Sequence, residues 1–104
     1  MIKAVMFRHG IEDDAAMARI YHRLDDVEAR CGQARRVEVV LDRVAFGDAS
    51  NYLCHISFRA ERKKSLDIYA DKRFASMAID DAFDRLNLAI KSGLNRRIRR
   101  RCNG

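Results

Sequence analysis

Several features that would place a chain in a special structural class are absent from this sequence. It has no proline, no internal repeat and no low-complexity linker. No segment approaches the roughly 18 consecutive apolar residues that a membrane-spanning helix requires. The first ten residues, MIKAVMFRHG, lack the apolar core and the small-residue cleavage site of a signal peptide. We therefore expect a cytoplasmic protein that does not associate with membranes.

Cysteine is too scarce, and too irregularly spaced, for a disulfide framework or a structural zinc site. The chain has an odd number of cysteines, and no two of them have CxxC spacing. This agrees with a reducing compartment. Cys54 lies in an apolar run and is predicted to be a buried small hydrophobic residue. The other two are Cys31 and Cys102.

Recognisable catalytic motifs are also missing. The chain has no GxSxG, HExxH or P-loop pattern, and its three histidines have no nucleophile at motif spacing. Asp80 and Asp84 lie one helical turn apart, so they could hold a metal or perform acid–base chemistry. Such a pair is more often part of a solvated early helical turn, where the helix dipole favours acids. We expect no enzymatic activity, no bound metal and no cofactor.

Positive charge is what the chain does have, and most of the excess lies at one end. The net charge is +6 over 104 residues. Residues 1–95 hold 16 of the 21 basic residues and all 15 acids, whereas residues 96–101 hold five arginines. Proteins that bind polyanions often have such an uneven distribution of charge along the chain, and so do proteins with a solvated basic tail. The hydrophobic content of 48% excludes wholesale disorder. We expect residues 1–95 to form one domain and residues 96–104 to form a basic C-terminal helical extension or tail.

Two hydrophobic periodicities alternate along the chain and predict its elements. Apolar residues at every second position predict strands over 1–7, 35–46, 52–60 and 65–70. Helical spacing predicts helices over 12–30 and 74–93. Short connections between the last three strands predict an antiparallel meander. The order is β-α-β-β-β-α, which predicts an α+β sandwich: an antiparallel-rich four-stranded sheet with two helices packed on one face. From the first helix onward this is also the order of double-stranded-RNA-binding domains.

The same periodicities predict the core and the helix ends. Asp13 or Asp14 could cap the first helix, and Gly32 could end it. Gly93 could stop the last helix, or the helix could cross it, since Leu94 and Ile98 continue the stripe. The predicted inward-facing residues are Ala16, Ile20, Leu24 and Val27; Val37, Val39 and Leu41; Cys54, Ile56 and Phe58; Leu66, Ile68 and Ala70; and Ile79, Phe83, Leu86 and Ile90.

The arginine-only tail suits phosphate, because the planar guanidinium group can donate two hydrogen bonds together. If the tail is helical, Arg96, Arg99 and Arg100 share one face, with Arg97 and Arg101 on a neighbouring one. No aromatic residue is interleaved with these arginines, so base stacking is not expected there. The simplest use is recognition of the backbone of a folded RNA.

Two stretches of the sequence resemble the ribosome hibernation-promoting factors, also called ribosome-associated translation inhibitors. ASMAIDDAFDRLNLAIKSGL is similar to the last helix of that family, which carries an AID…DKL…QL pattern. YHRLDDVE is similar to a KL.KLE pattern on its first helix. The element order and the length agree with the family's short, sigma-54 modulation protein-like forms. The matching positions are Ala78, Ile79, Asp80, Asp84, Arg85, Leu86 and Ile90 on the last helix, and Arg23, Leu24 and Glu28 on the first.

The resemblance implies a non-catalytic regulator of translation that acts in the stress response. Family members present a basic face of both helices to the rRNA of the small ribosomal subunit. They lie in the channel shared by mRNA and the tRNA anticodon stems, and they silence idle ribosomes. In this chain the family's basic run after DKL is thinned to Lys91, and arginines follow one or two turns later. The predicted RNA-binding residues are Arg19, Arg23, Arg85, Lys91, Arg96, Arg97, Arg99, Arg100 and Arg101; Arg30 falls near Arg19 and Arg23 on a more polar side of the first helix.

Two other functions remain open from the sequence. A protein-interaction module on the same fold would self-associate through the outer face of its sheet, where Val40, Val44, Leu53 and Tyr69 are predicted to lie. Alternatively, the tail alone would bind any DNA or RNA duplex without a preference for ribosomes. Deleting residues 95–104 would then abolish all binding.

Overall fold

A computed structural model describes residues 1–11, 13–61 and 65–102, without the side chains of residues 46 and 93–102. It contains four strands and two helices in the predicted order. Period-two segments form the strands and the two segments of helical spacing form the helices, so the α+β prediction is confirmed. The elements are β1 (Ile2–Phe7), α1 (Asp14–Arg30), β2 (Ala34–Phe46), β3 (Ala49–Ala60), β4 (Leu66–Lys72) and α2 (Ala75–Cys102).

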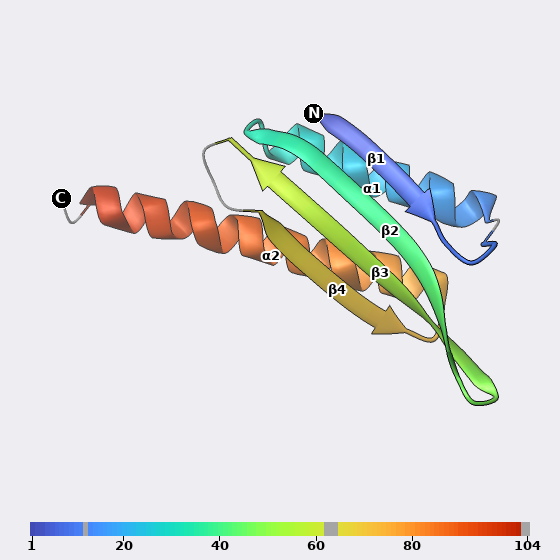
Figure 1. Cartoon of the computed structure of the whole chain (residues 1–104). Coiled ribbons are helices and arrows are strands. Elements are labelled where there is room, and N and C mark those ends of the chain that lie inside the picture. Colours follow the sequence, from blue (N-terminus) through green and yellow to red (C-terminus); the bar gives the residue numbers. More distant parts are fainter. Residues whose placement is uncertain (12, 62–64, 103–104) are drawn as a thin grey trace.

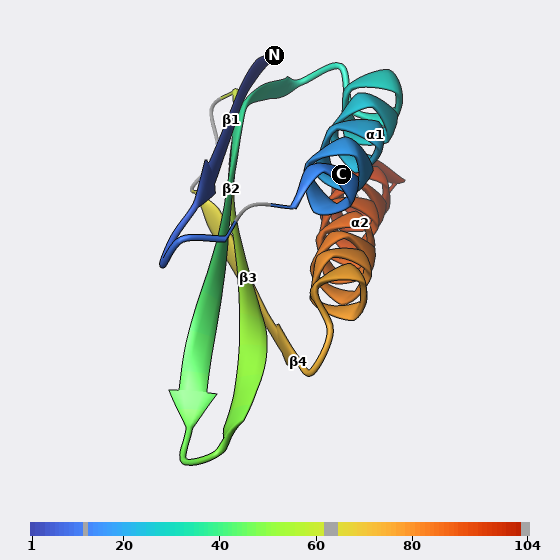
Figure 2. The same ribbon diagram turned by 90° about the vertical axis from the view of Figure 1, so that its right-hand side faces the viewer.

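The strands form one sheet in the order β1-β2-β3-β4. The last three strands are an antiparallel meander, as predicted, while β1 pairs with β2 in parallel. A parallel neighbour requires a crossover, and α1 supplies it. Both helices lie on the same face of the sheet, and no helix or strand of the described residues covers the opposite face (Figures 1 and 2). The sheet therefore has one covered face and one open face.

The core lies between the helices and the covered face of the sheet. Both predicted helical stripes point into it, because residues three and four apart share one side of a helix. Leu66 and Ile68 of β4 and Ile90 of α2 are partly buried at its margin. The core consists of Ala16, Ile20, Leu24, Val27, Val37, Val39, Leu41, Cys54, Ile56, Phe58, Ala60, Ala70, Ala78, Ile79, Ala82, Phe83 and Leu86.

Local signals account for the ends of α1. The Asp13 carboxylate accepts a hydrogen bond of 3.0 Å from the backbone N–H of Ala16, which satisfies a donor that the first turn would leave unpaired. At the other end the backbone N–H of Cys31 donates to the carbonyl of Val27. The C-cap is therefore Cys31, one residue before the glycine that the sequence suggested.

The last helix begins within one residue of its predicted start and takes the second of the two predicted alternatives at Gly93. It begins at Ala75, and its first turn holds no acid. Asp80 and its neighbours therefore lie beyond the turn in which the helix dipole acts, so dipole stabilisation does not explain them. The helix also crosses Gly93 and continues to Cys102. Residues 91–102 extend the helix by about 18 Å beyond Ile90, and this end projects past the sheet (Figure 1).

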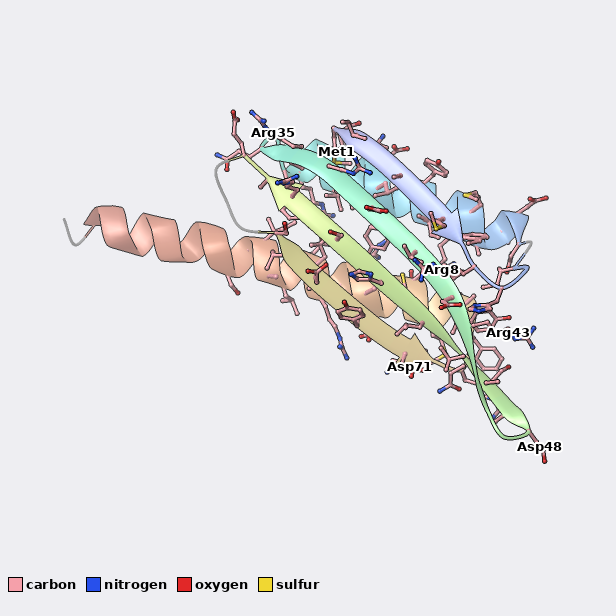
Figure 3. The ribbon with its side chains drawn as sticks, in the orientation of Figure 1. Met1, Arg8, Arg35, Arg43, Asp48 and Asp71 are labelled. Atoms are coloured by element: carbon pink, nitrogen blue, oxygen red, sulfur yellow. The ribbon has the colours of Figure 1, made fainter. Side chains whose placement is uncertain are left out.

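The hairpin of β2 and β3 projects at the opposite end of the molecule. Pairing of β2 with β1 ends at Leu41, and pairing of β3 with β4 begins at Tyr52, whereas β2 and β3 pair up to Phe46 and Ala49. Asp48 lies at the tip of this two-stranded arm (Figure 3). Gly47 has a φ of 58°, a left-handed conformation that glycine adopts without strain.

Candidate nucleic-acid interface

Arg19 on α1 is held by a carboxylate of α2. Its guanidinium group donates two hydrogen bonds to Asp80, of 3.0 Å from Nε and 2.5 Å from the terminal nitrogen. This contact raises the pKa of Arg19 and lowers the pKa of Asp80. The pair lies at the helix–helix surface and is partly exposed. The positive charge of Arg19 is therefore balanced within the protein.

Arg23 is held in the same way one turn further along α1. It donates a 2.6 Å hydrogen bond to the carboxylate of Asp84, and its guanidinium carbon lies 5.5 Å from the centre of the Phe83 ring. Only 22% of its side chain is exposed. The structure thus brings Arg19 and Arg23 to one surface as predicted, but it also brings a carboxylate to each of them.

Arg85 points to a different side of α2. It forms an ion pair of 3.2 Å with Asp81 and donates a 3.0 Å hydrogen bond to the backbone carbonyl of Tyr69 on β4. It therefore faces the edge strand of the sheet, whereas Arg19 and Arg23 lie between the two helices. Arg19, Arg23 and Arg85, which were all predicted to bind RNA, do not form one cationic surface in the free protein.

Lys91 and Arg30 differ from these arginines because neither has a hydrogen bond or an ion pair among the described side chains. Arg30 is the last residue of α1, and Lys91 lies on α2 where that helix leaves the core. Both line a groove of about 500 Å³ between the two helices. Its other walls come from Val27, Cys31, Asp84, Asn87, Leu88 and Ile90.

The tail arginines continue from this groove along the same helix. The backbone of α2 is helical through Arg96, Arg97, Arg99, Arg100 and Arg101, but the positions of these side chains lie outside the described residues. The sequence therefore supplies five further positive charges immediately beyond Lys91. We call these five arginines, together with Arg30 and Lys91, the basic end of the molecule.

The sequence prediction omitted Arg30 from the binding residues. Its helical spacing from Arg23 was visible, but nothing local showed that α1 ends beside Lys91 of α2. Two further cations without a hydrogen bond or ion pair among the described side chains, Lys72 and Arg73, lie where β4 leads into α2. They sit at the opposite end of the molecule from the basic end.

The open face of the sheet carries both apolar and charged residues. Tyr69 is 54% exposed and stacks on the ring of His55, with 4.3 Å between the ring centres. His55 in turn forms a 2.9 Å contact with the Asp67 carboxylate. Ile2 and Met6 on β1 are also exposed. Of the residues predicted for this face, Tyr69 is exposed, whereas Val40, Val44 and Leu53 are partly buried, and charged side chains such as Asp67 lie near Tyr69.

The described part of the chain contains no group of three or more histidine, cysteine or acidic side chains able to hold a metal ion. None of the helices, over the residues described, is long and apolar enough to cross a membrane.

Comparison with known proteins identifies the fold. No protein-family model matches this chain, and no curated protein does either. Among solved structures, it is similar to a ribosomal subunit interface protein from Coxiella burnetii, with a TM-score of 0.75 and 7% identity over 91% of this chain and 99% of the other. It is also similar to the N-terminal domain of Thermus thermophilus Protein Y, with a TM-score of 0.68 and 19% identity over 88% of this chain and 98% of that domain.

Proposed function

We propose that this protein is a ribosome-associated RNA-binding protein that docks on the small ribosomal subunit and inhibits translation or promotes hibernation. It would be a divergent short member of the hibernation-promoting factor family, acting in the cytoplasm without catalysis. The observation that carries the proposal is the similarity of fold, over almost the whole chain, to a ribosomal subunit interface protein. The residue patterns of both helices and the arginine-rich end support it independently.

The proposed contact is the basic end rather than the centre of the helix pair. Arg30 and Lys91 offer charges that no described carboxylate neutralises, and the tail arginines continue the same helix. Arg19, Arg23 and Arg85 contribute only where an RNA phosphate replaces Asp80, Asp84 or Asp81. Residues 1–95 would serve as the folded body and residues 96–104 as the extension that follows the RNA backbone.

Binding of this kind requires no chemistry beyond charge and shape. Each phosphate that an arginine or lysine neutralises releases counterions, which makes the affinity depend steeply on salt. A folded body bound in the path of mRNA and tRNA would block initiation by occupying that volume. The proposal therefore predicts inhibition that disappears as the salt concentration rises.

The test is co-sedimentation with purified small subunits at low and high salt. Wild-type protein is expected to pellet with the subunits at low salt and to remain free at high salt. The double variant Arg30→Ala/Lys91→Ala is expected to lower the slope of log affinity against log salt by about 1.4 to 1.8, since two phosphate contacts are lost. The matched control is Lys72→Ala/Arg73→Ala, which removes the same charge at the opposite end.

Equal effects of the two double variants would mean that only net charge matters, and would refute the proposed contact. Free protein at every salt concentration would refute ribosome binding itself. A cell-free translation reaction with the same variants then links binding to inhibition, because the two should weaken in parallel.

Self-association through the open face is a second candidate, favoured by the exposed Ile2, Met6 and Tyr69 on that face. Light scattering over a range of concentrations distinguishes it, since a protein that stays monomeric would contradict it. The variant Tyr69→Lys should disrupt such a dimer without affecting the basic end.

A further inference from the structure

The groove at the basic end has an apolar interior as well as a cationic rim. Val27 is buried at its floor, and Ile90 is partly buried beside it. Leu88 forms an exposed wall, with 66% of its surface accessible to solvent. Leu88 therefore adds apolar surface to the groove, whose volume of about 500 Å³ falls in the range of small-molecule binding sites.

The charges around the groove restrict what can occupy it. Arg30 and Lys91 lie on its rim without partners among the described side chains. The carboxylate of Asp84 also reaches the groove, but it is engaged by Arg23. A second copy of this chain would bring its own net charge of +6 to an end that is already basic. Charge complementarity therefore favours a polyanion over a second copy.

A bare phosphate chain or an intact duplex would leave the apolar interior unused. Duplex RNA presents phosphates and ribose to a protein, with its bases stacked inside. An unpaired nucleotide presents phosphates together with a free base, which has two apolar faces and a polar edge. Asn87 supplies one amide donor group and one acceptor at the groove, which are the groups that read such an edge.

We propose that this groove accepts the base of a single unpaired nucleotide of RNA, while Arg30 and Lys91 contact the phosphates on either side of it. This inference rests on the proposed function and narrows it from RNA in general to RNA with a bulged, looped or single-stranded residue. Val27, Leu88 and Ile90 contact the faces of the base, and Asn87 contacts its edge.

The first test compares two short fluorescent RNA oligonucleotides by anisotropy: one with all bases present, and one with a single central abasic ribose. Both carry the same number of phosphates, so only the base differs. The intact oligonucleotide is expected to bind about tenfold more tightly, since that ratio corresponds to about 1.4 kcal/mol. Leu88→Ala should remove most of this difference and leave binding of the abasic strand unchanged.

Met77→Ala is the matched control, because Met77 is also exposed on α2 but lies near the start of the helix. It should preserve the preference for the intact strand. Since Leu88 is mostly exposed, its replacement should not unfold the protein, and far-ultraviolet circular dichroism checks this.

The second test uses Cys31 as a reporter inside the groove. In a Cys102→Ser chain the two remaining cysteines are Cys31 and Cys54, and burial raises the pKa of the Cys54 thiol to about 12, so it reacts slowly. The intact oligonucleotide is expected to slow alkylation of Cys31, and the abasic one is expected to do so much less.

Equal affinity for the two oligonucleotides, or equal protection of Cys31, would overturn the inference and leave ribosome binding standing. Failure of both oligonucleotides to bind would also overturn the inference about the groove. The proposed function would be refuted as well only if the protein also failed to co-sediment with small subunits. Protection of Cys31 that grows with protein concentration in the absence of RNA would identify a second copy as the occupant, which would likewise refute the inference.

Discussion

Replacing Asp80 and Asp84 by asparagine removes both carboxylates that hold Arg19 and Arg23 across the helix pair. The side chains keep their size, and the net charge rises from +6 to +8. The core beneath remains intact, because Phe83 and Ile79 do not change. The double variant therefore asks whether these two arginines can reach RNA once their internal partners are gone.

The expected magnitude follows from the number of charges released. If both arginines lie within reach of bound RNA, two additional phosphates are neutralised, and the slope of log affinity against log salt should steepen by about 1.4 to 1.8. The affinity at low salt should rise accordingly. Folding stability should change by no more than about 1 kcal/mol for each pair, because both ion pairs remain accessible to water.

The assay is a salt titration of binding to a labelled fragment of small-subunit rRNA, followed by anisotropy. The matched control is Asp48→Asn/Asp71→Asn, which gives the same net charge of +8 from two exposed acids at the hairpin end of the molecule (Figure 3). Neither control residue holds an arginine through a hydrogen bond or ion pair among the described side chains.

A steeper slope for Asp80→Asn/Asp84→Asn than for the control would place Arg19 and Arg23 at the interface. Equal slopes for both variants would mean that the arginines act only through net charge. An unchanged slope for Asp80→Asn/Asp84→Asn would show that RNA does not reach the helix pair, and the predicted roles of Arg19 and Arg23 would then be wrong.

Three further outcomes are expected. Phe83→Ala should lower the free energy of unfolding by about 3 to 5 kcal/mol in chemical denaturation, because it empties a fully buried site; a loss below about 1 kcal/mol would contradict the packing. Deleting residues 96–104 lowers the net charge to +1, so it should flatten the salt dependence of RNA binding. The melting temperature should not change, and a large drop in it would mean that this segment packs on the domain. The contact with Arg19 holds the pKa of Asp80 below its ordinary value of 3.8. The carboxylate of Asp80 therefore contributes its full stabilisation above pH 3.8, and this contribution is lost as the pH falls through the lower pKa of the folded state. Asp80→Asn should show a weaker fall in stability over that acid range, and identical pH profiles for the two proteins would refute the contact.

Local periodicity was sufficient to predict most of the fold. Alternation over residues 35–46 and 52–60 placed Val39 and Ile56 on the buried face, because successive side chains of a strand point to opposite sides. Helical spacing placed Ile20 and Phe83 in the core for the corresponding reason. These patterns depend on residues only a few positions apart, so they can be recognised from the sequence alone.

Helix ends were predicted less well than helix faces. The Asp13 cap was among the two predicted candidates, since its signal is local. The start of α2 was predicted to within one residue, but its passage through Gly93 was left as one of two alternatives, because a single glycine costs a helix only about 1 kcal/mol and can be crossed.

The sequence by itself determined that this chain has two amphipathic helices, a four-stranded sheet and a surplus of arginine at one end. Only the tertiary structure decided which arginines meet a carboxylate. Arg19 and Asp80 are 61 residues apart, and so are Arg23 and Asp84. Packing of α1 against α2 joins those pairs and places Arg30 and Lys91 on one groove, where neither forms an ion pair with a described side chain. Charge composition is a property of the chain, but electrostatic potential at a surface depends on distances of a few ångströms, which folding alone sets.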